Sequence, residues 1–147
     1  MDEIIVRIVS TNPDMSNPQY MSSGAAGMDL GAALDDPVSI TPGQVKRIGT
    51  GIRIAIPDGF EGQVRPRSGL AMKHSIGILN SPGTIDSDYR GEIGVLLINF
   101  GDTPYVVTRG ERIAQLVITA VPKVKIEVTD SLDETDRGSG GFGHTGL

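Results

Sequence analysis

The sequence predicts an all-β fold, and three observations support this prediction. Short runs of β-branched and apolar residues recur along the chain, separated by turn-forming tripeptides such as Thr-Pro-Gly at 41–43. Only residues 68–74 have a helical pattern, about two turns long. Because the sequence contains no long amphipathic helix, a parallel α/β sheet is disfavoured, and a sandwich or barrel of short strands is expected.

The expected strands begin at residues 4–9, which read Ile-Ile-Val-Arg-Ile-Val. A second strand covers 26–30, where one acid, Asp29, stands among apolar residues. An acid that such a strand buries needs a partner. The turn at 41–43 separates two further short strands, 38–40 and 45–48.

In the middle of the chain, strands are expected at 52–56 and 62–65, on either side of a Pro-Asp-Gly turn. The short helix follows, and then a strand at 76–79. Residues 80–92 contain Pro-Gly and Arg-Gly pairs, which predict a hairpin. The remaining strands are expected at 93–100, 105–107, 113–120 and 124–128.

Composition excludes several classes of protein. The chain has 147 residues, enough for one domain with its own core. It has no Cys and only two His, which excludes disulfides and thiolate metal sites and disfavours a zinc site. No apolar run approaches the ~20 residues of a membrane span, and no targeting segment is recognisable, so we expect a cytoplasmic protein without a membrane partner. A net charge of -5 disfavours nucleic acid as a partner.

Charge divides the chain into two parts. Up to residue 126 there are 12 Lys or Arg and 13 Asp or Glu, whereas the rest has five acids and one Arg. Residues 131–147 have almost no apolar mass and are rich in glycine. We therefore expect a β domain at 1–130 and a flexible C-terminal arm at 131–147.

Three segments could carry chemistry, and each has a plainer interpretation. The arm contains Arg-Gly-Ser-Gly-Gly-Phe-Gly-His-Thr-Gly at 137–146, a possible phosphate nest or a disordered terminus. Residues 65–71, Arg-Pro-Arg-Ser-Gly-Leu-Ala, lead into the predicted helix. They could bind an anion at the helix N-terminus, or Ser68 could simply be the N-cap. Residues 80–92 contain two carboxylates, Asp86 and Asp88, followed by Tyr89. The segment could be a hairpin that carries the reaction, or only an Asx-rich turn.

Taken in order with Ala-Gly-Met-Asp-Leu at 26–30 and Gly-Glu-Arg-Ile-Ala-Gln-Leu at 110–116, these segments resemble the five motifs of the trimeric dUTPases. The resemblance covers nearly the whole chain. It implies a jelly-roll-like (β-clip) subunit and a homotrimer in which the arm of one subunit closes a neighbour's active site. It also implies hydrolysis of dUTP to dUMP and pyrophosphate, with Mg²⁺ as cofactor, which lowers dUTP and supplies dUMP for thymidylate synthesis.

The resemblance assigns Asp86 as the carboxylate that activates the attacking water on the α-phosphate. Asp29 is expected near metal-bound waters rather than as a direct ligand, with Mg²⁺ held by triphosphate oxygens and waters. Tyr89 is expected against the deoxyribose and Phe142 over the uracil. The implied substrate-binding residues are Arg67, Ser68, Gly69, Asn80, Gly83, Thr84, Ile85, Tyr89, Gln115, Arg137, Phe142, Gly143, His144 and Thr145.

Two alternatives compete with dUTP hydrolysis. A related dCTP deaminase on the same fold is expected to have a Glu in the strand after the hairpin, but residues 93–100 contain no carboxylate. A nucleotide-binding module without catalysis would not need Asp86 or Arg137, which are both present. A second role with a regulatory partner stays open.

Overall fold

The computed structural model describes residues 3–146. Met1, Asp2 and Leu147, which belong to the predicted domain and arm, lie outside the described residues. Within this range the structure has ten strands and one helix, in agreement with the predicted all-β class. The elements are β1 (Arg7–Ser10), β2 (Met28–Gly31), β3 (Val38–Ile40), β4 (Val45–Ala55), β5 (Phe60–Arg65), α1 (Ser68–His74), β6 (Ile76–Ile78), β7 (Gly83–Ile85), β8 (Glu92–Asn99), β9 (Tyr105–Val107) and β10 (Arg112–Ala120).

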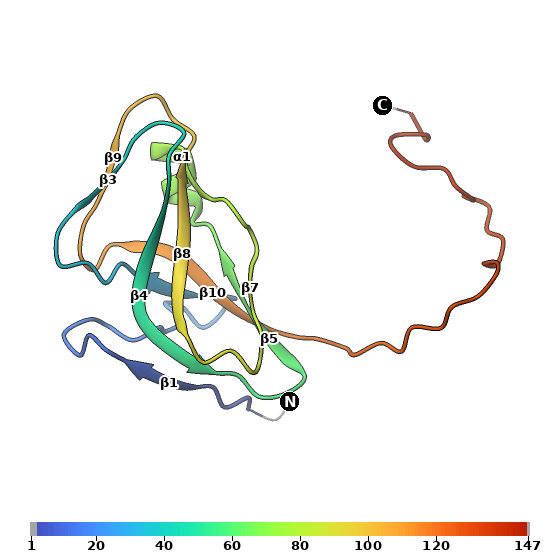
Figure 1. The fold of residues 1–147 in the computed structure, drawn as a ribbon, viewed down its shortest axis with the longest axis horizontal. Coiled ribbons are helices and arrows are strands. Elements are labelled where there is room, and N and C mark those ends of the chain that lie inside the picture. The colour runs from blue at the N-terminus through green and yellow to red at the C-terminus, as the bar shows by residue number, and fades with distance from the viewer. Residues whose placement is uncertain (1–2, 147) are drawn as a thin grey trace.

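Two four-stranded antiparallel sheets make up the body, with a two-stranded ribbon at one end (Figure 1). The strand orders are β1-β4-β8-β6 and β2-β10-β5-β7, and β3 pairs with β9 in the ribbon. Apolar side chains from both sheets fill one shared core, which includes Leu30, Ile48, Val64, Leu97 and Leu116. Their alternation with polar residues along each strand explains why these segments form half-buried strands.

The two strands expected at 45–48 and 52–56 are one strand, β4, with a bulge. Its pairing with β8 shifts register between Gly49 and Arg53. Inside the bulge, the buried Thr50 hydroxyl donates a 2.7 Å hydrogen bond to the Ile93 carbonyl. This bond keeps β4 attached to β8, so the glycines around Thr50 bend the strand without ending it.

Residues 80–92 are not a β-hairpin, which corrects the prediction. β7 pairs with β5, and β8 pairs with β4 and β6, so the two limbs of the segment belong to different sheets. The predicted strand at 124–128 is also wrong. Its alternating Val124, Ile126 and Val128 side chains are exposed, and a strand forms only where a neighbouring strand offers backbone partners.

The chain after β10 leaves the body and extends away from both sheets (Figure 1). Residues 122–146 contain no helix or strand, and nearly all of them are exposed. The Val121 amide still bonds to the Gly59 carbonyl at 2.8 Å, and the Lys123 ammonium contacts the Asp58 carboxylate at 2.8 Å. These contacts fix where the segment departs, at the turn between β4 and β5.

Asn99, at the end of β8, is a fully buried polar residue that fastens the ribbon to the body. Its amide nitrogen donates to the carbonyls of Ile40 (2.9 Å) and Thr103 (2.8 Å), and its side-chain oxygen accepts from the Gly101 amide at 2.8 Å. Since an unsatisfied buried polar group carries a desolvation cost, the removal of Asn99 leaves three backbone groups without their partner.

We expect Asn99→Ala to lower the free energy of unfolding by about 2–4 kcal/mol, measured by urea denaturation. Asn17→Ala, at an exposed asparagine, is the control and should change it by less than about 0.5 kcal/mol. Equal effects of the two substitutions would contradict the anchoring role of Asn99.

Candidate functional site

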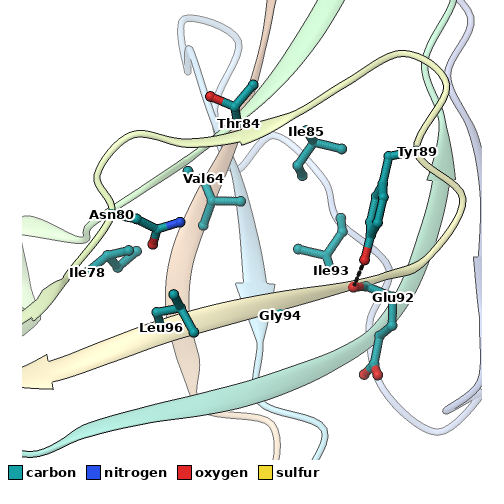
Figure 2. Close-up of a pocket in the computed structure, with 11 residues that line it drawn as sticks. Val64, Ile78, Asn80, Thr84, Ile85, Tyr89, Glu92, Ile93, Gly94 and Leu96 are labelled. Atoms are coloured by element: carbon teal, nitrogen blue, oxygen red, sulfur yellow. Dashed lines mark hydrogen bonds between the residues drawn. The ribbon is translucent and has the colours of Figure 1, made fainter.

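A small cavity of about 120 Å³ lies where edge strand β7 of one sheet meets β8 of the other (Figure 2). It brings together five of the predicted substrate-binding residues. Apolar side chains from β5, β6, β7 and β8 form its floor, and Asn80 and Tyr89 flank it (Figure 2). The lining residues are Val64, Ile78, Asn80, Gly83, Thr84, Ile85, Tyr89, Glu92, Ile93, Gly94 and Leu96.

Strand β7 presents its backbone to this cavity. It pairs on one side with β5, from Gly62↔Ile85 to Val64↔Gly83, and it ends the strand order of its sheet. An edge strand has a row of amide and carbonyl groups that no other strand of the sheet satisfies. Such a row can recognise a planar ligand with its own donors and acceptors, while the buried Ile85 side chain closes the space behind it.

Sequence reasoning missed the cavity residues contributed by β8. Burial alternates along β8 from Glu92 to Leu97, and the cavity is lined by residues of both classes, the buried Ile93 and the half-buried Glu92, Gly94 and Leu96. The sequence pattern marks 93–100 as an apolar strand, but it does not reveal that β7 lies beside it. That proximity follows from the tertiary pairing of β7 with β5.

Tyr89 stands at the edge of the cavity, and its hydroxyl donates a 3.0 Å hydrogen bond to the backbone carbonyl of Glu92 (Figure 2). The Tyr89 amide donates a 3.1 Å hydrogen bond to the Asp86 carbonyl, which closes a tight turn immediately before Tyr89. The side chain is 45% exposed, so one ring face remains free for a ligand.

Asp86 lies in that turn, is exposed, and does not line the cavity. It borders a second hollow at the root of the arm, together with Asp58, Asp88 and Lys123. Lys123 forms a hydrogen-bonded ion pair with Asp58, which holds the pKa of Asp58 below its ordinary value. Within one chain, the Asp86 side chain is therefore solvated and borders this second hollow instead of the apolar cavity.

Asp29 forms a separate cluster on β2. Its carboxylate is 16% exposed and accepts from two guanidinium groups, Arg67 Nε at 3.2 Å and Arg112 Nη1 at 3.0 Å. Arg67 Nη1 also donates to the Arg112 carbonyl at 3.1 Å. The acid predicted to need a partner thus has two, and the cluster keeps one net positive charge.

Gln115 of β10 lies beside this cluster, because it is paired with Asp29 of β2 on one side and with Arg65 of β5 on the other. Residues directly opposite in a ladder point to the same face of the sheet. Gly27 leaves room there, since a Cβ at that position would stand 3.0 Å from the Gln115 side-chain oxygen.

Helix α1 begins next to this cluster. Arg67 occupies the N-cap position and its side chain does not cap the helix, so the N-cap interpretation of Ser68 is wrong. Ser68 and Gly69 form the first turn, which contains no acid, while Lys73 and His74 stand in the last turn. This charge distribution agrees with the helix dipole and leaves the first turn open to an anion.

None of the predicted site residues of the arm reaches the cavity or the arginine cluster formed by Arg67, Arg112 and Asp29. Phe142 is fully exposed, and Gly143, His144 and Thr145 follow it in a turn near the end of the arm. Arg137 donates only to the nearby Gly140 carbonyl, at 2.8 Å. A single chain thus presents the cavity, the arginine cluster and the arm as separate parts.

Within residues 3–146, no three His, Asp or Glu side chains converge into a metal-binding group. Oxygen donors suit Mg²⁺, and Asp29 is the acid next to the arginine cluster. Both of its oxygens already accept hydrogen bonds, which suits contact with a metal-bound water better than direct ligation. No helix of the described range is long and apolar enough to cross a membrane.

Comparison with known proteins identifies relatives over the whole chain. The family model described as dUTPase matches residues 14–146. A deoxyuridine 5'-triphosphate nucleotidohydrolase from Syntrophotalea carbinolica is 53% identical over 147 residues and is covered along its whole length. One from Chlamydia pneumoniae is 58% identical over 130 residues, which are 88% of this chain and 90% of that protein.

Solved structures with the same fold include the Staphylococcus bacteriophage 80alpha dUTPase with dUpNHpp, at a TM-score of 0.88 and 23% identity. The match covers 97% of this chain and 99% of that one. A variant dUTPase of phage phi11 of S. aureus, described with a structural Mg(II) ion, has a TM-score of 0.79 and 20% identity, over 88% of this chain and 99% of that one. These likenesses confirm the predicted jelly-roll-like fold.

We expect Asp29→Ala to destabilise the chain by about 1–3 kcal/mol, because it leaves Arg67 and Arg112 facing each other without their shared carboxylate. Thermal unfolding monitored by circular dichroism measures the effect. Asp36→Ala is the matched control at an exposed acid and should leave the melting temperature nearly unchanged. A melting temperature unaffected by Asp29→Ala would contradict the role of this cluster.

Proposed function

The chain belongs to the dUTPase family and is an enzyme of the dUTP diphosphatase class, and we propose that it uses the sites described above for in-line attack of water on the α-phosphate of dUTP. The observation that best supports the proposal is the small cavity beside the edge strand β7, with Tyr89 at its mouth. The products are dUMP and pyrophosphate. In a cell this reaction lowers dUTP and supplies dUMP for thymidylate synthesis.

Uracil would enter the cavity with its polar edge toward β7. Backbone groups of Gly83, Thr84 and Ile85 and the amide of Asn80 would pair with the base, as a complementary base does. The apolar floor, which includes Val64 and Ile85, limits the room beyond the base. A volume of about 120 Å³ supports exclusion of the larger, methylated base thymine.

The deoxyribose would lie against the ring of Tyr89. Because the tyrosine hydroxyl is bonded to the Glu92 carbonyl, the ring is held from both ends, by its backbone and by its hydroxyl. A fixed ring can exclude the 2′-hydroxyl of a ribonucleotide by steric conflict. Discrimination against UTP is therefore assigned to Tyr89.

Asp86 would orient the attacking water on the open side of the turn. An ordinary aspartate is a weak base, so its contribution is position more than basicity. Phosphoryl transfer depends mostly on alignment and on stabilisation of charge, which one carboxylate and a set of cations can provide. The exposed position of Asp86 leaves room for both water and the α-phosphate.

The triphosphate would bind to the arginine cluster and the first turn of α1, through Arg67, Ser68, Gly69 and Gln115. Arginine suits this task because its planar fork matches phosphate oxygens. Mg²⁺ bound by triphosphate oxygens and waters would neutralise phosphate charge, and Asp29 would hold one of those waters. The site thus needs no protein ligand bound directly to the metal.

We further propose a homotrimer in which these parts meet between chains. The arm, residues 131–147, would close over a neighbour's site, with Phe142 on the uracil and with Arg137, Gly143, His144 and Thr145 near the terminal phosphates. The extended path of the arm supports this arrangement, since its described residues contact neither cluster of their own chain. Closed symmetry lets each arm complete one site.

The competing functions have less support. The acid of β8 that lies near the cavity is Glu92. Its carboxylate accepts a hydrogen bond from the Gly51 amide of β4 and does not point into the cavity, as a deaminase would need. A binding module without catalysis has no use for Asp86 on an accessible turn. A regulatory partner remains compatible with dUTP hydrolysis.

We expect Asp86→Asn to reduce the rate of pyrophosphate release from dUTP by at least about 10³-fold, while binding of a non-hydrolysable dUTP analogue stays within about threefold. Asp88→Asn, two residues further on, is the matched control and should retain most of the activity. The assay includes Mg²⁺ and compares dUTP, dCTP, dTTP and UTP.

Hydrolysis confined to dUTP in the unmodified protein is the expected result of that comparison. Ammonia release from dCTP would support the deaminase instead, and full activity of Asp86→Asn would contradict the proposed role of this carboxylate.

A further inference from the structure

We infer that Glu92 is a positioning residue for nucleotide selectivity, which acts by fixing the carbonyl that holds the Tyr89 hydroxyl. This inference rests on the proposed hydrolysis of dUTP and concerns the side chain of Glu92, since only its backbone carbonyl has a role in that proposal. Glu92 is the first residue of β8, and its side chain points away from the cavity toward β4 (Figure 2).

The carboxylate of Glu92 is bound at the bulge of β4. Its Oε1 accepts a 2.8 Å hydrogen bond from the Gly51 amide, at the point where β4 and β8 lose their regular register. The Arg47 guanidinium lies 4.0 Å from Oε2 and adds positive charge. Because the bulge interrupts the ladder, this side-chain bond takes the place of a missing backbone bond between the strands.

Space for the carboxylate is provided by Gly49. A Cβ at position 49 would stand 2.5 Å from Glu92 Oε1, closer than side-chain carbons approach an oxygen. The bulge and the glutamate therefore fit each other, and β4 holds Glu92 in one place.

The next link is from Glu92 to Tyr89. The Glu92 carbonyl accepts from the Tyr89 hydroxyl at 3.0 Å, and the ring lies over Gly91. A Cβ on Gly91 would overlap the tyrosine hydroxyl oxygen and stand 2.5 Å from Cζ, so the ring occupies the space that a side chain there would need. The ring is thus held against the backbone of residues 91 and 92.

A second contact fastens the same stretch of chain to β4. Arg53 Nε donates to the Arg90 carbonyl at 2.8 Å, and Arg53 is also the ladder partner of Glu92 in the β4–β8 pairing, so residues 90 and 92 are both attached to β4 on either side of Gly91. Loss of the Glu92 carboxylate would release one of these three attachments, the hydrogen bond to the Gly51 amide. The backbone under the tyrosine ring could then shift without unfolding the two sheets.

Selectivity is the property most sensitive to such a shift. Exclusion of a 2′-hydroxyl depends on ring position to within a fraction of the diameter of one oxygen atom, whereas attack of water depends on Asp86 and the phosphate contacts. We therefore expect Glu92 to influence the ratio of kcat/KM for dUTP over UTP more than kcat for dUTP.

The test compares Glu92→Ala with Glu92→Gln, which keeps an oxygen that can accept from the Gly51 amide. We expect Glu92→Ala to lower the dUTP-over-UTP ratio about three- to tenfold, the range for loss of one hydrogen bond, with kcat for dUTP changed less than about twofold. Glu92→Gln should retain the ratio of the unmodified protein. Equal loss in both variants would overturn the role of this hydrogen bond.

Tyr89→Phe keeps the ring but removes the hydroxyl that bonds to the Glu92 carbonyl. It is the second test of the inference and replaces Glu92→Ala if that variant does not fold. It should lower the ratio in the same direction, and relative binding of dUMP and UMP should change in parallel. An unchanged ratio in folded Glu92→Ala or in folded Tyr89→Phe would overturn the inference. Failure of the unmodified protein to hydrolyse dUTP would refute the proposed function, whereas selective hydrolysis with no effect of these variants would refute the positioning role alone.

Discussion

The structure depends on the position of β10 between β2 and β5. This ladder places Gln115 directly between Asp29 and Arg65, although these residues are far apart in sequence. The same arrangement brings Arg112, at the start of β10, to the Asp29 carboxylate, which also holds Arg67 at the entrance of α1. A continuous backbone ladder thus assembles a cluster of positive charge that no local segment could form alone.

The sheet that contains β10 ends at β7, and this edge creates the second part of the site. Because β7 pairs only with β5, its outer backbone groups face the cavity beside β8. The sheet that contains β10 therefore holds the arginine cluster and one wall of the cavity, while β8 of the other sheet forms the opposite wall. The arm extends away from both, which gives the proposed trimer a physical reason (Figure 1).

Much of this organisation could be predicted from the sequence. The ribbon strands and the helix have the predicted bounds, because turn residues mark their ends clearly. The bulge in β4 could not be predicted, since the bond that keeps the strand continuous joins Thr50 to Ile93. The pairing of β7 with β5 and the partners of Asp29 are likewise tertiary. The pattern of 124–128 indicates a strand, but within residues 3–146 no strand pairs with it.

The central claim is that each active site takes Asp86 and the arm from different chains. Two defective chains test it: full-length Asp86→Asn, and a chain ending at residue 136 that keeps Asp86 but lacks the glycine-rich end of the arm. Each should be nearly inactive alone, and the two refolded together should regain dUTP hydrolysis. A mixture of Asp86→Asn with a chain carrying both changes is the control and should stay inactive. Persistent inactivity of the first mixture, with mixed trimers present, would contradict the claim.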